Sequence, residues 1–510
     1  MSSPAGAPTT TGGAPAPSDG ATSPAGPPTS AGPPEAPERS PGRSPARALL
    51  VVFVALALVA GLLVASALSV PTLARSFGLA IDVPTGEAPE PVVVRPRLVA
   101  AGADAPAPTP SGVAAALNAR TGGLGDLTGI VVDPAAGTAL WSRGPGDPQV
   151  PASSTKLLTA AASLLTLDPT SRWTTSVVSG PTPDSVVLVG GGDPTLSSLP
   201  VGQESAYRGA AHLDDLVAQV AATRAGAPAL RTVYLDLGRY AGATLAPGWD
   251  PADIAGGNVA PIVPVMLDGG RLQPTEVDGP RTASPAETAG RELARRLGAP
   301  SAQIVTGPAP PAATPLGRVG SPPTTELVRL ALQNSDNVLA EALGREVALR
   351  TGAPATFPGA AAGVTRILAE RGVDVSGVTL ADTSGLSTAD RIPASGLAAV
   401  LAPAAAPSTD PAEPAVPAGA LRPILDGLPV AGGGGTLADR YGVGTPSGPG
   451  RGWVRAKTGT LTGTSALAGV VTDADGRVLV FAFMSNGSDV TAARPRLDAL
   501  AATLRGCGCR

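Results

Sequence analysis

The sequence has a single histidine, two cysteines and few aromatic residues, and each shortage excludes a class of protein. Because His212 is alone, no cluster of histidines can bind zinc, and a Ser-His-Asp triad would have to use this one residue. We interpret His212 as a solvated surface residue, so a serine enzyme built from this chain needs another base, and lysine is the natural substitute. No metal ion and no cofactor are expected.

Charged residues are also scarce, at 15% of the chain, and the net charge is -4 at pH 7. This balance gives no basic footprint for nucleic acid, so no nucleic-acid partner is expected. The two cysteines, Cys507 and Cys509, lie at the extreme C-terminus, so the core is predicted to fold without disulfides. They could close a small ring or pair between chains, but we favour a frayed tail without a function.

The N-terminal part differs in composition from the rest of the 510-residue chain. Residues 1–47 consist largely of Pro, Ala, Gly, Ser and Thr and are predicted to be a disordered cytoplasmic tail. Residues 48–70 form a run of 23 residues without a charge, long enough for one transmembrane helix that anchors the protein in the cell membrane. Arginines 39, 43 and 47 precede this run, so the positive-inside rule predicts that the rest of the chain is extracytoplasmic.

A cleaved signal peptide is the alternative, with the Ala-Ser-Ala stretch at 65–67 as the cleavage signal and a secreted mature protein. The preceding tail is long for a signal peptide, and the apolar run is long for its hydrophobic segment, so we favour the uncleaved anchor. Residues 71–110 are rich in Pro and Ala without a sustained period and are predicted to be a linker.

The chain is organised around Ser153 and Lys156. The residues that follow, 157–167, are apolar and alanine-rich and contain neither Gly nor Pro, which favours a helix. Ser153 is predicted at the start of this helix, with Lys156 on the same face. A hydroxyl beside an amine at a helix start can serve as a nucleophile with its base.

Two later motifs strengthen this interpretation. Ser-Asp-Asn occurs at 335–337, and Lys-Thr-Gly occurs at 457–459. Each motif alone is more readily explained as a helix cap, a turn or a strand end. All three together, in this order, are typical of penicillin-binding proteins and class A β-lactamases.

The residue types suggest a role for each member. Lys156 can take the proton of Ser153 only if its pKa falls well below about 10.4, and both burial and a second cation, Lys457, act in that direction. Ser335 and Asn337 would complete a hydrogen-bond network over Lys156, and Ser335 could relay a proton to the leaving amine.

The last motif is predicted to bind the substrate. Lys457 and Thr458 offer a positive charge and a hydroxyl that suit a terminal carboxylate. Gly459 lets a substrate backbone approach the strand closely. The backbone N–H groups of Ser153 and Thr460 are predicted to form the oxyanion hole.

About 180 residues separate the first two motifs, which is too long for a simple connection. We predict a catalytic domain formed by 111–176 and 316–510, with a β-rich domain inserted at 177–315. We expect this insert to shape substrate access without taking part in the chemistry. Strand-like segments of this region are 174–179, 185–190, 230–237 and 261–267.

With these residues in view, the sequence resembles the D-alanyl-D-alanine carboxypeptidase/endopeptidase family, the low-molecular-mass class C penicillin-binding proteins. Beyond the three motifs, the stretches at 191–196, 382–386, 435–437 and 454–462 look like family sequence, and the resemblance covers about 111–505. It implies an α/β (α+β) fold with a β-lactamase/transpeptidase-like domain, in which helices flank an antiparallel sheet.

The resemblance also implies the reaction. The D-Ala–D-Ala bond of peptidoglycan stem peptides would be cleaved through an acyl-serine, with possible endopeptidase action on cross-links. β-Lactams would acylate the same serine as covalent inhibitors. Ser153, Lys156, Ser335, Asn337, Lys457 and Thr458 are the residues carried over.

Two other classes share parts of this pattern. A class A β-lactamase has the three motifs but a much shorter span between the first two. A non-catalytic wall-binding protein would need neither Ser153 nor Lys156, and labelled penicillin would fail to mark it.

The predicted topology can be tested on intact cells. Protease added from outside should leave residues 1–47 protected and degrade the rest, because the anchor at 48–70 separates them. A mature N-terminus near Leu68 would instead show signal cleavage and contradict the anchor.

Overall fold

The computed structural model describes residues 105–407 and 419–509, all of which belong to one compact unit, Leu98–Arg510. The predicted tail at 1–47, the predicted anchor at 48–70 and most of the predicted linker at 71–110 lie outside the described residues. Within the described ranges, no helix is both long enough and apolar enough to cross a membrane.

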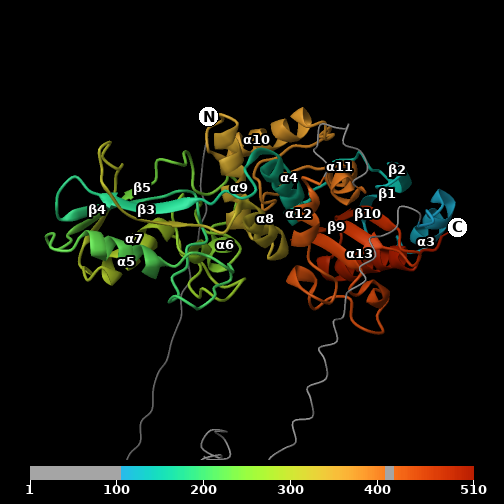
Figure 1. Ribbon diagram of the computed structural model, residues 1–510. Helices are drawn as coiled ribbons and strands as arrows, with labels where there is room; N and C mark the ends of the chain where they lie inside the picture. The colour runs from blue at the N-terminus through green and yellow to red at the C-terminus, as the bar shows by residue number, and fades with distance from the viewer. Residues whose placement is uncertain (1–104, 408–418, 510) are drawn as a thin grey trace, which may run out of the picture. The chain divides into compact units, whose positions relative to one another are not determined.

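An antiparallel sheet of five strands combines segments from the N-terminal and C-terminal parts of the described chain (Figure 1). Its strand order is β2-β1-β10-β9-β8. Strand β1, which precedes the first motif in the sequence, therefore pairs with β10, which follows the last motif. In β1, Asp126 lies opposite Asn486 and Val132 lies opposite Val480 of β10. The strands are β1 (Asp126–Asp133), β2 (Thr138–Arg143), β8 (Val454–Leu461), β9 (Thr464–Thr472) and β10 (Val478–Asn486).

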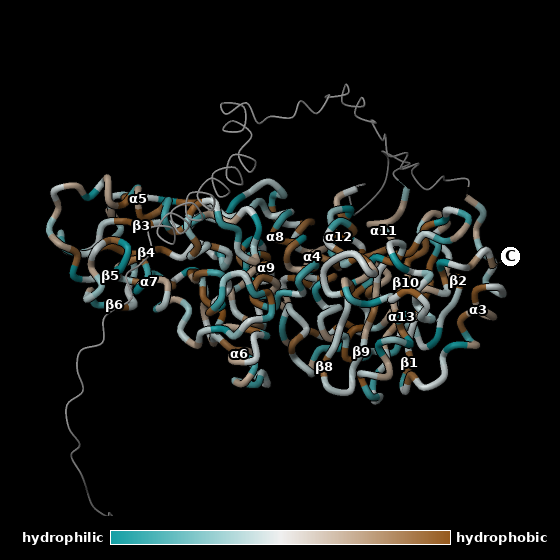
Figure 2. Tube along the Cα trace, turned by 90° about the horizontal axis from the view of Figure 1, so that it is seen from below, coloured by the Kyte–Doolittle hydropathy of each residue, from teal (hydrophilic) through white to brown (hydrophobic). Residues whose placement is uncertain are grey.

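Alternation along β10 sends its side chains into two hydrophobic clusters, one on each face of the sheet. Phe481 and Phe483 pack with α3 and α13, whereas Ala482 and Met484 join the cluster that contains α4 and α11. Figure 2 shows brown, hydrophobic segments gathered around α4 and β10. The predicted antiparallel sheet flanked by helices is thereby confirmed. The four helices are α3 (Pro110–Asn118), α4 (Lys156–Thr166), α11 (Ala394–Ala405) and α13 (Val490–Arg505).

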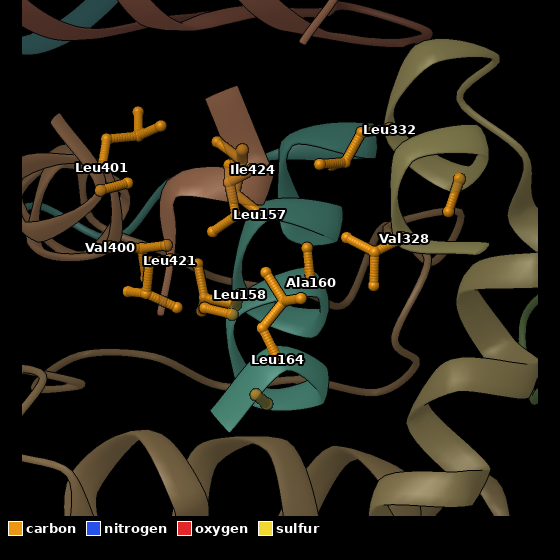
Figure 3. Close-up of a cluster of buried hydrophobic side chains, with 14 of the residues drawn as sticks. Leu157, Leu158, Ala160, Leu164, Val328, Leu332, Val400, Leu401, Leu421 and Ile424 are labelled. Carbon is orange, nitrogen blue, oxygen red and sulfur yellow. The ribbon is translucent and has the colours of Figure 1, made fainter. Parts of the chain in front are cut away.

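Helix α4 lies at the centre of the larger cluster. Its residues 156–165 are all buried, and its Leu and Ala side chains contact neighbours on several sides. Figure 3 shows Leu157, Leu158 and Leu164 among Val328 and Ile424 and their neighbours. This packing fixes the helix that presents Ser153 and Lys156. The helices packed around it include α8 (Thr324–Gln333), α9 (Asn337–Arg350), α10 (Phe357–Glu370) and α12 (Arg422–Gly427).

A second five-stranded sheet, of order β6-β5-β4-β3-β7, is formed by the segment between the first two motifs. Strands β4, β5 and β6 are parallel, whereas β3 is antiparallel to both of its neighbours. Two helices, α5 and α7, share its hydrophobic cluster, and in Figure 1 they lie beside the green strands. The elements are β3 (Thr174–Ser179), β4 (Ser185–Val189), α5 (Leu213–Thr223), β5 (Thr232–Asp236), α7 (Pro285–Arg296), β6 (Gln303–Thr306) and β7 (Pro315–Gly320).

Loops between β5 and α7 form a smaller cluster against α9 and α10. Trp249 stacks edge-on against Phe357 with ring centroids 5.1 Å apart, and Val338 lies in the same cluster. The loop region therefore packs on the helix that begins at the second motif. The remaining short helices are η1 (Ala152–Thr155), α6 (Ala252–Ala255), η2 (Asp268–Gly270), η3 (Gly435–Leu437) and η4 (Gly448–Gly450).

Several local expectations differ from the structure. The segment 261–267, expected as a strand, is not one, and the helices α5 and α7 make the sheet region less purely β than predicted. Leu213, Leu216 and Val220 of α5 and Ala289 and Leu293 of α7 are buried in the hydrophobic cluster of this sheet. Whether the region at 177–315 folds as a separate domain remains a prediction.

The C-terminal cysteines are ordered, which corrects the expectation of a frayed tail. Cys507 and Cys509 form a disulfide, and Cys507 is buried. The carbonyl of Cys509 accepts hydrogen bonds from the backbone N–H and the hydroxyl of Thr109, which caps α3. The tail thus holds the start of the described chain through backbone contacts that residue types do not reveal.

The buried position of α4 predicts a large effect of truncation. Leu158→Ala should lower the free energy of unfolding by about 2–5 kcal/mol, because Leu158 is 0% exposed and the cavity cannot fully close. Urea denaturation followed by circular dichroism measures this loss. Leu349→Ala is the control, since Leu349 is 37% exposed and should change stability by less than about 1 kcal/mol. Equal effects of the two substitutions would contradict the packing described.

Candidate active site

Ser153 lies in a tight turn just before α4. The residues 152–155 form the 3-10 helix η1, and α4 continues from Lys156 without a break. Ala152 adopts a left-handed conformation with φ 48, which an L-residue rarely takes. The Ser153 side chain is half-buried and lines a cleft of about 840 Å³. The turn therefore presents the hydroxyl to the cleft from a rigid helix.

Lys156 is held in the site by burial and by three hydrogen bonds. Its side chain is buried, and Nζ donates to Ser153 Oγ at 2.9 Å, to Asn337 Oδ1 at 2.6 Å and to the Ser384 carbonyl at 2.7 Å. Burial lowers the pKa of Lys156 to about 8, although the carboxylates around it, with Asp382 foremost, oppose the shift. An amine with such a pKa can accept the Ser153 proton near neutrality.

The second motif forms the junction between α8 and α9. Ser335 has φ 55, a left-handed conformation that costs about 1–2 kcal/mol for a residue with a Cβ. Asp336 caps α9 by accepting from the Leu339 N–H at 2.9 Å. Asn337 accepts from Lys156 and donates from Nδ2 to the carbonyl of Asn258 at 2.9 Å. Hydrogen bonds to Lys156, to the Leu339 N–H and to the Asn258 carbonyl therefore hold the strained turn in place.

The third motif lies on β8, opposite the first two. Lys457 is 0% exposed, and its Nζ donates to Ser335 Oγ at 2.8 Å and to the Thr458 carbonyl at 2.8 Å. Burial and the nearby charge of Lys156 hold the pKa of Lys457 well below its usual value. Burial, rather than Lys457, is the first cause of the lowered pKa of Lys156. The expected repulsion between the two amines therefore acts mainly on Lys457.

The hydroxyls beside Lys457 face the cleft. Thr436, Thr458 and Thr460 line it, and Thr436 Oγ1 lies 2.8 Å from Thr458 Oγ1. Lys457 itself is not among the lining residues described. A ligand carboxylate entering the cleft would thus meet the threonine residues first, with the Lys457 amine behind them.

Gly459 has a structural role beside the predicted one. A Cβ at this position would overlap the carbonyl oxygen of Pro151 and lie 3.2 Å from the Cβ of Ala152. The missing side chain thus lets β8 approach the turn that carries Ser153, rather than only a substrate. Ser153 and Thr460 line the same cleft, and their N–H groups as an oxyanion hole remain a prediction.

The turn at 382–386 completes the surroundings of Lys156, and it was not predicted as part of the site. The Ser384 carbonyl is an acceptor of Lys156, and a Cβ on Gly385 would overlap the Ala152 carbonyl. Asp382 accepts from the Ser384 N–H at 3.0 Å and from Trp249 Nε1 at 2.8 Å. A backbone carbonyl leaves no signal in residue type, so only the family-like sequence of this turn could have indicated it.

Three carboxylates lie buried behind this turn. Glu341, Asp382 and Asp390 are each 0% exposed, and burial together with the charge of Asp382 raises the pKa of Glu341 and of Asp390. Thr383 donates to Glu341, and Thr155, which precedes α4, donates to Asp390. The cluster supplies negative potential that keeps Lys156 from losing its proton too readily.

His212 plays no part in this arrangement. It is half-buried at the start of α5, and its Nδ1 lies 3.0 Å from the Leu199 carbonyl. It is not among the residues described around the cleft. No group of His, Cys, Asp and Glu suited to a metal ion occurs in the described ranges.

Comparison with known proteins gives matches along most of the described chain. The model of the D-Ala-D-Ala carboxypeptidase 3 (S13) family matches residues 113–283 and 278–506. Carboxypeptidase DacB of Mycolicibacterium smegmatis is 47% identical over 427 residues, which cover 83% of this chain and 90% of the relative. Carboxypeptidase Rv3627c of Mycobacterium tuberculosis is 45% identical over 426 residues, which cover 82% of this chain and 89% of the relative.

A solved structure shares the fold. The crystal structure of penicillin binding protein 4 (dacB) from Haemophilus influenzae matches with a TM-score of 0.59 and 19% identity. The match covers 76% of this chain and 97% of that chain.

The pKa of Lys156 sets a testable pH dependence. Lys156 can act as a base only after losing its proton, so acylation by a penicillin should rise as pH increases through about 8 and then level off. Below that pH the rate should fall about tenfold per unit. Stopped-flow measurement of acylation between pH 5.5 and 9.5 tests this.

Glu341→Gln serves as the control, because Glu341 also titrates from a buried position. The rising limb should persist but move to lower pH, since a negative charge near Lys156 is lost. A rate that is independent of pH from 6 to 9 in the unchanged protein would contradict Lys156 as the base.

Proposed function

Because the chain belongs to the D-Ala-D-Ala carboxypeptidase 3 (S13) family, we infer that it is a serine-type D-Ala-D-Ala carboxypeptidase, and we propose that Ser153 is its nucleophile. The observation that carries the assignment is the distance of 2.9 Å between Ser153 Oγ and the buried Nζ of Lys156. The family predicted from the motifs is thus confirmed, rather than that of a class A β-lactamase or a non-catalytic wall-binding protein.

The acylation step follows from these positions. Neutral Lys156 takes the proton of Ser153 while Oγ attacks the carbonyl carbon of the penultimate D-Ala. The N–H groups of Ser153 and Thr460 stabilise the oxyanion of the tetrahedral intermediate. The C–N bond then breaks, and Ser335 relays the proton that Lys156 took from Ser153 to the leaving amine of the terminal D-Ala, so that Lys156 is neutral again. Ser335 Oγ lies 2.8 Å from Lys457 Nζ.

Hydrolysis of the acyl-serine returns the site to its starting state. Lys156 removes a proton from water, and the resulting hydroxide adds to the acyl carbon. The ester C–O bond breaks, Ser153 recovers its proton and the shortened stem peptide leaves with a carboxylate. Asn337 holds Nζ of Lys156 at 2.6 Å through both steps.

The terminal carboxylate of the substrate is assigned to the threonine side of the cleft. Thr458 and Thr436 supply hydroxyl donors, and the charge of Lys457 behind them favours an anion. Gly459 contributes indirectly, since it allows β8 to stand close to Ser153.

The substrate is proposed to be peptidoglycan, and β-lactams are proposed as covalent inhibitors. A structure of Haemophilus influenzae penicillin binding protein 4 has been solved in complex with a β-lactam, at a TM-score of 0.52 and 20% identity to this chain. Endopeptidase action on cross-links would use the same acyl-serine chemistry. A single-pass anchor at 48–70 with the catalytic part outside the cytoplasm suits an extracytoplasmic polymer.

Substitution of the nucleophile tests the assignment. Ser153→Ala should abolish release of D-Ala from a peptide ending in D-Ala–D-Ala and abolish covalent labelling by penicillin, with the melting temperature nearly unchanged. Ser154→Ala is the matched control, because Ser154 is buried beside the nucleophile and is not among the cleft-lining residues described. Mass spectrometry of the labelled protein should place the adduct on Ser153, and an adduct on another residue would overturn the assignment.

A further inference from the structure

The carboxylate of Asp336 receives three side chains from the segment between the first two motifs. Oδ2 accepts from Tyr207 at 2.9 Å, from Arg271 at 2.5 Å and from Arg281 at 3.2 Å. Asp336 lies between Ser335 and Asn337, both of which contact the lysines of the site. Side chains of the inserted segment therefore bind Asp336, the middle residue of the second motif.

The side chains of Arg271 and Tyr207 are themselves held by further contacts. Arg271 donates to the carbonyls of Asp268 and Val277, each at 3.0 Å, and stacks over the Tyr207 ring at 4.7 Å. Tyr207 is 0% exposed, and the Arg271 side chain is 1% exposed. Neither is among the cleft-lining residues described, whereas Arg281 is. Tyr207 and Arg271 thus reach the reacting groups only through Asp336.

The negative charge on Asp336 depends on its ion pairs with the two arginines. Burial opposes ionisation, yet Arg281 and Arg271 hold the pKa of the carboxyl well below its usual value. A buried carboxylate without its partners would be strongly unfavourable, and the turn would rearrange to rehydrate it. Because Ser335 is already in a left-handed conformation, loss of the Asp336 anchor would let the turn relax and move the Ser335 hydroxyl away from Lys457.

We propose that Arg271 and Tyr207 are positioning residues for acyl transfer, which hold Asp336 and so fix Ser335 and Asn337 against Lys457 and Lys156. This assignment rests on the proposed function. It revises the expectation that the insert only shapes access, because the segment supplies the supports of a catalytic turn. Removal of the segment would then impair small and polymeric substrates alike.

Kinetics of penicillin acylation on the full chain test the proposal. Tyr207→Phe removes one donor to Asp336 and should slow acylation by about tenfold, while Arg271→Gln should slow it by about a hundredfold. Arg271→Lys keeps the charge and should restore part of that loss. Melting temperatures are recorded in parallel, so that a change in stability is separated from a change in rate.

The pH profile gives a readout that a purely structural role would leave unmoved. Lys156 is faced by the carboxyl groups of Asp336, Asp382, Glu341 and Asp390 and by the buried amine of Lys457. Loss of the Arg271 charge leaves Asp336 less neutralised, which raises the pKa of Lys156. The rising limb of Arg271→Gln should therefore move to higher pH, while Tyr207→Phe should keep the limb in place.

Arg296→Gln is the matched control within the same segment. Arg296 pairs with Asp214 at 2.6 Å and with Glu292 at 2.7 Å, and it contacts no described residue of the site. It should acylate at the normal rate per folded molecule, even with a lowered melting temperature.

Two outcomes would overturn the proposal. One is an Arg271→Gln protein that acylates at the normal rate with its pH limb unmoved. If that protein fails to fold, a normal rate for Tyr207→Phe decides against the proposal in its place. A wild-type protein that carries no adduct on Ser153 would instead reject the proposed function, so the two failures are distinct.

Discussion

The buried amine of Lys156 is the constraint on which the rest of the site depends. An ammonium out of contact with water is stable only if its protons are donated to fixed acceptors, and here three different segments supply them: Ser153, Asn337 and the Ser384 carbonyl. Burial also brings the pKa to about 8, which makes the same group able to take a proton. The burial of this one amine therefore fixes the three groups that accept its hydrogen bonds and also makes the amine able to act as a base.

Holding these acceptors in place requires backbone that is unfavourable by itself. Ala152 and Ser335 are two of the four non-glycine residues with positive φ in the described ranges, and both adjoin the reacting groups. The turns persist because β8 and the 382–386 turn press against the first, while Asp336 anchors the second. The packing of α4 and of the inserted segment thus stabilises these strained backbone conformations beside the reacting groups.

The sequence could predict the site better than its surroundings. The three motifs together indicated the reactive pair of Ser153 and Lys156, and the family resemblance implied the antiparallel sheet. The grip of Arg271 on Asp336 was not predictable, because the two residues are 65 positions apart and arginine is common on surfaces. The close approach of Gly459 to the Pro151 carbonyl was not predictable for a similar reason, because that carbonyl belongs to a distant turn.

Direct titration of the amine tests the account most closely. Lys156 and Lys457 are the only two lysines in the 510-residue sequence, so a protein labelled with carbon-13 lysine gives two Cε signals, and Lys457→Arg leaves only that of Lys156. We predict that the remaining signal titrates near pH 8, well below the value of about 10.4 for a free lysine. A Lys156 signal that stays protonated to pH 10 in the folded protein would contradict the account.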